Sequence, residues 1–128
     1  MTKKKVLIVD DNADILALLH ATLDLADMFE VFEASDGTTA VALAASLKPE
    51  MVLMDIMMPG AIDGLEACRQ IKAAGGDAAP KVVLVSAKPV DQIKEGAKAS
   101  GADLFIAKPF GPVQLVASLT ALYRNPST

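Results

Sequence analysis

Five short runs of β-branched and aliphatic residues recur along the chain. They cover residues 5–9, 29–34, 51–54, 81–85 and 103–107. Most of these runs lack the alternation of apolar and polar residues that marks a strand with one solvent-facing side. We therefore predict five strands that are mostly buried on both faces of a sheet.

Between these runs the apolar residues repeat with the period of an amphipathic helix. The stripes fall within residues 15–26, 41–45, 65–72, 90–99 and 115–123. The stripe in 90–99 is thin, because only Val90, Ile93 and Ala97 stand among charged residues. It also contains Gly96, and a glycine inside a helix costs about 1 kcal/mol relative to alanine. We expect this fourth helix to be weakly held.

Turn-forming residues separate the units, notably Ser35-Asp36-Gly37, Lys48-Pro49, Gly75-Gly76 and Gly101. The alternation of strands and helices predicts a (βα)₅ α/β protein, with a doubly wound, five-stranded parallel sheet covered by helices on both faces. A chain of 128 residues fits one domain. Because the sequence shows no linker or low-complexity tract, we expect residues 1–128 to form one domain without an output domain.

Composition and charge narrow the class of protein. Hydrophobic residues make up 52% of the chain and aromatic residues only 4%, so the core must be aliphatic. The net charge of −4 would repel nucleic acid, and the basic residues form no stripe, so we expect no nucleic-acid binding. The single cysteine, Cys68, is expected to be a small buried hydrophobe. No signal peptide or long apolar run is present, so we expect a cytoplasmic protein without membrane contact.

Candidate chemistry gathers where the predicted strands end. Asp10 and Asp11 follow the first strand, Asp55 the third, Ser86 the fourth and Lys108 the fifth. In an open parallel sheet, ligands bind outside the carboxyl ends of the strands, near the point where the strand order reverses. We therefore expect these five side chains to converge on one edge of the sheet.

Three carboxylates at one edge require positive charge nearby. Like charges about 4 Å apart repel by roughly 4 kcal/mol at an effective dielectric near 20. A hard divalent ion such as Mg²⁺, together with Lys108, would meet this need. Such a site suits phosphoryl transfer, in which a protein mainly positions groups and neutralises charge. Asp55 ends the most hydrophobic strand and is the expected acceptor, forming an aspartyl phosphate.

The chain resembles the receiver domains of bacterial response regulators, and among these the single-domain chemotaxis-regulator type. The matching segments are VLIVDDN at 6–12, VLMDIMMP at 52–59, DGLE at 63–66, VLVSA at 83–87 and FIAKPF at 105–110. They span nearly the whole chain. The resemblance implies the flavodoxin-like strand order 2-1-3-4-5.

The resemblance also implies roles for individual residues. Asp55 would accept the phosphoryl group, while Asp10, Asp11, Asp55 and the backbone carbonyl of Met57 would bind Mg²⁺. Lys108 would pair with the phosphoryl oxygens. Ser86 would move to hydrogen-bond one of these oxygens after transfer, and Phe105 would act as the aromatic switch that turns inward.

The family resemblance further implies partners. The donor would be a sensor histidine kinase or a histidine phosphotransfer protein. Phosphorylation would alter the surface formed by the fourth helix, fifth strand and fifth helix, for a downstream protein target. The chain would catalyse only its own phosphorylation and dephosphorylation, as a monomer or weak dimer.

Two features depart from the family pattern. Gly60, Ala61 and Ile62 place three residues, rather than the usual two, between Pro59 and the Asp-Gly pair. Met57 and Lys88 occupy positions where similar domains vary their rate of self-dephosphorylation. Met57 offers no charge to orient water and Lys88 would shield the phosphoryl group, so we predict a long-lived phosphorylated state.

Three alternatives remain open at this point. A haloacid-dehalogenase-like phosphatase would need its nucleophile after the first strand and a second Asp two residues later, where this chain has Asn12. A flavin- or nucleotide-binding module would need Gly, Ser or Thr where Asp10 and Asp11 stand. A pseudo-receiver would keep the fold and signal by binding alone.

Overall fold

The computed structural model describes residues 3–87, 90–108 and 111–124. The five strands are β1 (Lys4–Val9), β2 (Phe29–Ala34), β3 (Met51–Asp55), β4 (Lys81–Ser86) and β5 (Leu104–Ala107). The helices are α1 (Ala13–Leu25), α2 (Gly37–Leu47), α3 (Gly64–Gly75), α4 (Val90–Ala99) and α5 (Pro112–Arg124), and a short 3₁₀ turn, η1 (Gly76–Ala78), follows α3. Each predicted strand agrees with the structure to within one residue at either end.

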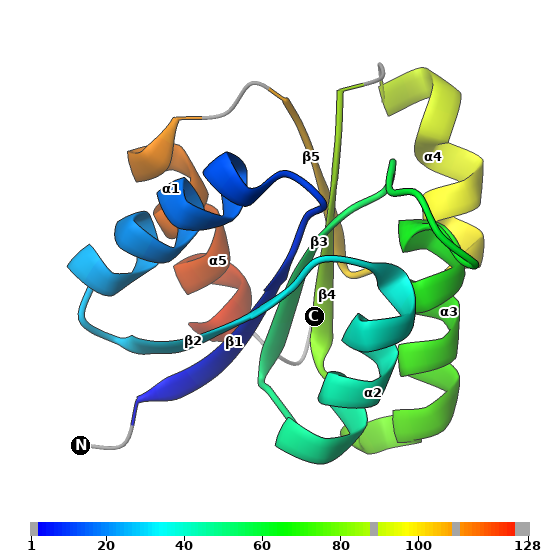
Figure 1. Cartoon of the computed structure of the whole chain (residues 1–128), viewed down its shortest axis with the longest axis horizontal. Helices are drawn as coiled ribbons and strands as arrows, with labels where there is room; N and C mark the ends of the chain where they lie inside the picture. The colour runs from blue at the N-terminus through cyan, green and yellow to red at the C-terminus, as the bar shows by residue number, and fades with distance from the viewer. Residues whose placement is uncertain (1–2, 88–89, 109–110, 125–128) are drawn as a thin grey trace.

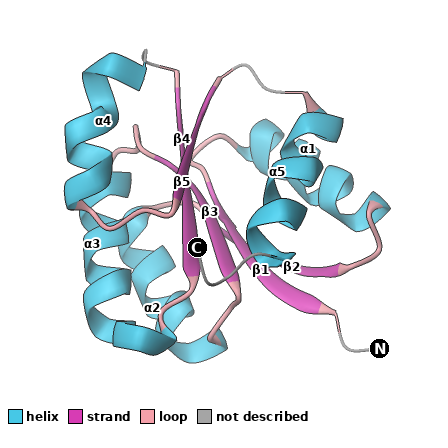
Figure 2. Cartoon of the chain, turned by 180° about the vertical axis from the view of Figure 1, so that it is seen from behind, coloured by secondary structure: helices cyan, strands magenta, loops and turns pink. Residues whose placement is uncertain are grey.

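The strands form one parallel sheet in the order β2-β1-β3-β4-β5, which is the flavodoxin-like arrangement. Figure 1 shows α1 and α5 on one face of this sheet and α2, α3 and α4 on the other, and Figure 2 shows the same layers from behind. The chain first winds from β1 to β2 and then crosses back over β1 to β3. The strand order therefore reverses between β1 and β3, where a doubly wound sheet places its ligand site.

The core lies in two apolar layers, one on each face of the sheet. All five residues of β3 are buried, as are the last four of β1 and the last five of β4. The prediction of strands buried on both faces is confirmed for these three. It is wrong for β2, which exposes Glu30 and Glu33, and for β5, which is at most half-buried. These two strands form the edges of the sheet, so each lacks a neighbour on one side.

Three helices begin at the carboxyl edge of the sheet with side-chain caps. Asn12 caps α1 by accepting hydrogen bonds from the amides of Asp14 and Ile15. Asp36 caps α2 by accepting from the amide of Thr39, and Asp63 caps α3 by accepting from the amide of Glu66. Such caps satisfy amides that have no partner within the helix. They fix the chain direction directly after β1 and β2 and at the end of the loop that follows β3.

Residues 90–99 form the predicted fourth helix, α4, which packs beside α3. Its Ile93 and Ala97 are buried in the apolar layer. Cys68 is also fully buried, as predicted. Among the described residues, no helix has both the length and the apolar character needed to cross a membrane.

Candidate functional site

An acidic cluster lies at the carboxyl edge of the sheet, between the ends of β1 and β3. Asp10 and Asp11 directly follow β1, and Asp55 is the last residue of β3. Asp10 and Asp55 are only 3% and 7% exposed, whereas Asp11 faces solvent. One carboxylate oxygen from each residue lies within 4.8 Å of the others. The predicted convergence of these three side chains is confirmed.

Backbone hydrogen bonds fix the two buried carboxylates. The amide of Asn12 donates to Asp10 Oδ1 over 2.9 Å, and the amide of Met57 donates to Asp55 Oδ1 over 3.1 Å. Each carboxylate thus accepts a hydrogen bond from the amide two residues further along the chain. The amide of Ile56 also donates to the carbonyl of Val85 over 2.9 Å, so pairing with β4 continues one residue past Asp55.

Lys108 supplies positive charge to this cluster from the end of β5. Its Nζ lies 3.1 Å from Asp55 Oδ2 and 3.5 Å from Asp10 Oδ2. Its backbone amide donates to the carbonyl of Ser86 over 2.8 Å, which ties the end of β5 to the end of β4. The carboxyl ends of β1, β3 and β5 are therefore joined through one ammonium group.

Burial and charge perturb the ionisation of the cluster. Burial raises the pKa of Asp10, as does the negative charge of Asp55, and these effects outweigh the opposing hydrogen bond from Asn12 and the charge of Lys108. Burial alone would lower the pKa of Lys108, but the hydrogen bond and negative charge of Asp55, helped by Asp10, raise it overall. Lys108 is therefore a cation at neutral pH, and the uncompensated charge of the cluster is negative.

The remaining predicted residues lie around this cluster. Ser86, the last residue of β4, is fully buried. Phe105 in β5 is half-buried and packs against the apolar layer on the α2–α4 side of the sheet. Met57 is 53% exposed in the loop after β3. Lys88, expected to tune dephosphorylation, lies outside the described residues.

The cluster fits a small divalent cation. Ligand oxygens of a six-coordinate Mg²⁺ lie about 2.1 Å from the ion, so two of them are at most about 4.2 Å apart. The carboxylate oxygens, within 4.8 Å of one another, reach that geometry with a small inward shift. Two of the carboxylates are buried and carry more negative charge than one lysine balances. The donor set is therefore that of a hard-cation site.

One residue beside Asp55 has a structural role that the sequence motif did not reveal. Gly64, the first residue of α3, donates its amide to the carbonyl of Ile56 over 3.0 Å. A Cβ at this position would lie 2.2 Å from the carbonyl oxygen of Asp55, closer than real Cβ atoms approach. The first turn of α3 can therefore rest on the peptide of Asp55 only because residue 64 is glycine. The Asp63-Gly64 pair was visible in the sequence, but this close approach was not.

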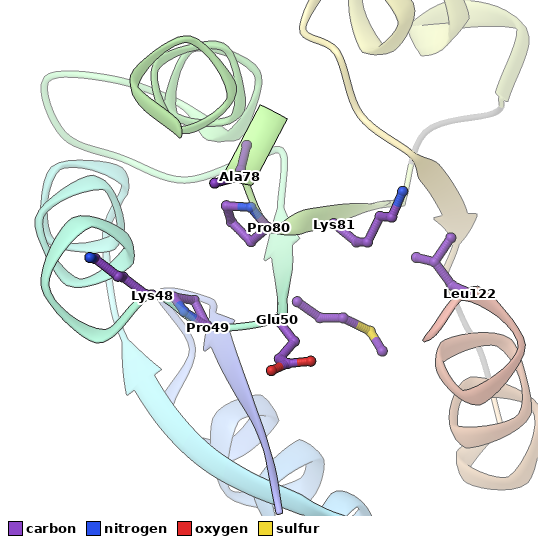
Figure 3. Close-up of a pocket in the computed structure, with 9 residues that line it drawn as sticks. Lys48, Pro49, Glu50, Ala78, Pro80, Lys81 and Leu122 are labelled. Carbon is purple, nitrogen blue, oxygen red and sulfur yellow. The ribbon is translucent and has the colours of Figure 1, made fainter. Parts of the chain in front are cut away.

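A separate pocket lies at the opposite edge of the sheet. Figure 3 shows it between Lys48, Pro49 and Glu50 before β3, Pro80 and Lys81 at the start of β4, and Leu122 on α5. It has a volume of about 370 Å³. Because its residues lie at the amino ends of the strands, it is not part of the acidic cluster.

Comparisons with known proteins agree with this geometry. Residues 6–120 match the model of the response regulator receiver domain. The DNA-binding response regulator MtrA of Mycobacterium tuberculosis is 35% identical over 123 residues, which are 96% of this chain and 52% of that protein. The chain spans about half the length of the curated relatives it matches.

Solved structures show the same fold. The chemotaxis response regulator CheY4 of Vibrio cholerae superimposes with a TM-score of 0.86 and 29% identity, covering 94% of this chain and 99% of that one. The receiver domain of DrrB, solved in a BeF₃-activated form, gives a TM-score of 0.83 and 26% identity, covering 96% of this chain and 99% of that one.

Proposed function

Because the chain belongs to the response regulator receiver domain family, we propose that it receives a phosphoryl group on Asp55. The observation that carries this proposal is the bridge from Lys108 Nζ to Asp55 and Asp10 within a buried acidic cluster. A structural salt bridge would need one carboxylate. Here one lysine faces two buried carboxylates and a third that is exposed, which leaves negative charge for a cation to balance.

In the proposed reaction a carboxylate oxygen of Asp55 attacks the phosphorus of the donor. A new P–O bond forms, the bond from phosphorus to the donor's leaving group breaks, and the leaving group departs with the bonding electrons. The product is an acyl phosphate on Asp55. The amide of Met57 holds the other oxygen of the carboxylate, which leaves Asp55 Oδ2 on the side of Lys108 as the attacking atom.

Lys108 would supply part of the positive charge, and a bound cation would supply the rest. Lys108, already 3.1 Å from Asp55 Oδ2, would move its hydrogen bonds onto the phosphoryl oxygens. Asp10, Asp11 and Asp55, with the carbonyl of Met57, would hold Mg²⁺. When bound, this ion neutralises charge on the transferring group and orients it. Ser86 would donate its hydroxyl to a phosphoryl oxygen after transfer.

The chain is a signalling module rather than a conventional enzyme, and receiver domains of its family interact with histidine kinases. We infer that a sensor histidine kinase or a histidine phosphotransfer protein is the donor, in the cytoplasm. The output would be a change in the α4–β5–α5 surface, with Phe105 turning inward as Ser86 moves, read by a downstream protein. Because the chain carries a net charge of −4, we do not propose that it contacts DNA, although its relative MtrA is named a DNA-binding regulator.

Beryllofluoride, a phosphoryl mimic, tests this proposal directly. In the presence of Mg²⁺ it should raise the Tm of the wild-type chain and leave Asp55→Asn unchanged, because the mimic needs the carboxylate oxygen. No effect on the wild type would instead favour a pseudo-receiver, and equal effects on both proteins would remove Asp55 as the acceptor. Multiple turnover of p-nitrophenyl phosphate would favour a phosphatase.

The lifetime of the acyl phosphate depends on access of water to phosphorus. Met57 stands exposed beside the site and carries no charge that could orient an attacking water. We expect the purified phosphoprotein in Mg²⁺ to persist well beyond seconds, measured by loss of the label with time. A half-life of seconds would contradict this expectation.

A further inference from the structure

The loop between β3 and α3, residues 56–63, carries Met57 and the additional residue within 60–62. Three of its side chains turn inward. Ile56 and Met58 are 4% and 8% exposed and belong to the apolar layer on the α2–α4 side, and the half-buried Ile62 packs against the same layer. The loop is therefore attached to the core on both sides of its exposed middle, Pro59 to Ala61.

Ile62 rests on the first residue of α2. A Cβ on the buried Gly37 would lie 2.8 Å from Ile62 Cγ1, 3.0 Å from the carbonyl oxygen of Ile62 and 3.3 Å from Ala67 Cβ. Real Cβ atoms essentially never approach within 3.0 Å of a heavy atom from a residue that is not adjacent in the chain. The loop can follow its path only because residue 37 has no side chain.

The first turn of α2 is firmly fixed where this contact is made. Asp36 accepts a hydrogen bond from the amide of Thr39 over 2.7 Å, and its carbonyl accepts one from the amide of Ala40 over 3.1 Å. Ala40 is fully buried. A side chain added at residue 37 would therefore displace the loop more readily than the helix.

We propose that the contact between Gly37 and Ile62 positions the β3–α3 loop, residues 56–63. Through this loop it positions the carboxylate of Asp55 and the carbonyl of Met57, which would bind the cation. The loop reaches the acidic cluster through Met57, whose amide donates to Asp55 Oδ1 over 3.1 Å. In this proposal, displacing Ile62 would pull on the exposed middle of the loop and, through the buried Met58, on Met57, and would thereby loosen the hold on the Asp55 carboxylate. Gly37 and Ile62 are thus positioning residues, and this inference rests on the proposed function.

The contact between Gly37 and Ile62 would also accommodate the longer loop. Residues 60–62 contain one residue more than the family pattern, next to a site that requires accurate geometry. Placing Ile62 against a residue without a side chain seats the longer loop in the core. Since residue 37 begins α2, the conformation of this helix becomes linked to the affinity of the site for its cation.

A set of four variants tests the contact. Gly37→Ala, Ile62→Ala, the double variant and the control Thr38→Ala, an exposed residue in the same turn, are compared with wild type. Two readouts are taken at each Mg²⁺ concentration: the initial rate of labelling by acetyl phosphate and the Tm. The Mg²⁺-dependent rise in Tm reports cation binding without any phosphorylation. Denaturant unfolding reports stability separately.

Gly37→Ala should raise the Mg²⁺ concentration for half-maximal effect by about 10-fold, the lower end of what loss of a supporting group costs at a metal site. Ile62→Ala should raise it by less than about 10-fold, below the usual range for loss of a supporting group, since the loop keeps its other anchors. The double variant should show less than the product of the two single effects, because removing Cγ1 relieves the closest of the three contacts of the new Cβ while those with the carbonyl of residue 62 and with Ala67 remain. Thr38→Ala should behave as wild type.

Multiplicative effects of the two substitutions would overturn the inference, because they would show that the residues act independently. So would a Gly37→Ala protein that loses stability but keeps the wild-type Mg²⁺ dependence. If Gly37→Ala does not fold, wild-type Mg²⁺ dependence in Ile62→Ala alone would overturn it. Absence of labelling and of any Mg²⁺ effect in wild type would instead refute the proposed function.

Discussion

At the scale of single residues, Asp10 shows that the site is built at a cost to stability. Its carboxylate is buried beside Asp55, and this burial raises its pKa even though Lys108 lies close to both carboxylates. The folded state therefore binds this proton more tightly than the unfolded chain. The contribution of this carboxyl to stability is greatest below the unfolded pKa, near 3.8, and is lost as the pH rises through the higher folded value.

Substituting Asp10→Asn should therefore stabilise the chain at neutral pH when Mg²⁺ is removed with a chelator. We expect a gain of about 1 kcal/mol in the free energy of unfolding, the usual scale for relieving one unfavourable charge. Urea unfolding at several pH values measures this. The difference from wild type should shrink as the pH falls below the raised pKa. A loss of stability at pH 7 in chelator would contradict this account.

Several site residues could be predicted from the sequence because each directly follows a predicted strand. Parallel strands end at one edge, so the order of apolar runs sufficed to bring Asp10, Asp55 and Lys108 together. The contacts of Gly37 and Gly64 could not be predicted in this way. They depend on how closely two elements approach each other, which no periodicity in the sequence encodes.

At the scale of elements, α4 is weakened by its own composition. Gly96 lies inside this helix, where glycine costs about 1 kcal/mol relative to alanine. A Cβ there would meet Leu65 Cδ1 on α3 at 3.1 Å. That atom is the tip of a flexible side chain, which can move aside by a few tenths of an ångström. Alanine at position 96 would therefore remove the cost of glycine with only a small movement of Leu65.

Gly96→Ala should raise the free energy of unfolding by about 0.5 to 1 kcal/mol and slow amide exchange within α4. Gly96→Leu serves as the contrast, since a larger side chain collides with Leu65 and should destabilise the chain. Denaturant unfolding and hydrogen exchange followed by mass spectrometry provide the two measurements. If alanine lowers stability as much as leucine does, the α3–α4 contact is rigid and α4 is not the weakly held element described.

Helix and strand positions were predictable because their apolar periods are clear, but two details of the elements were not. The edge strand β5 looks like a buried strand in sequence, since Leu104 to Ala107 carry no polar residue, and its exposure follows from its place at the edge of the sheet. In β2, by contrast, the exposed positions are the polar Glu30 and Glu33. The 3₁₀ turn η1 lies in a glycine-containing segment that predicted only a break in the chain.

At the scale of the whole molecule, cation binding and folding are linked. An ion that binds only the folded chain adds RT ln(1 + [L]/Kd) to the free energy of unfolding, or about 1.4 kcal/mol at ten times its Kd. Mg²⁺ should therefore stabilise wild type in a concentration-dependent manner. Asp10→Asn should show much less of this effect, although it is the more stable protein in chelator. Equal Mg²⁺ effects on the two proteins would place the cation elsewhere.

In the proposed reaction, Asp55 accepts a phosphoryl group with the help of the acidic cluster and Lys108. Intact-mass spectrometry after incubation with acetyl phosphate tests it most directly, comparing wild type and Asp55→Asn with and without Mg²⁺. We predict that wild type gains one phosphoryl group only with Mg²⁺ and that Asp55→Asn gains none. A phosphoryl group on Asp55→Asn, or an unmodified wild type in Mg²⁺, would rule out this reaction at Asp55.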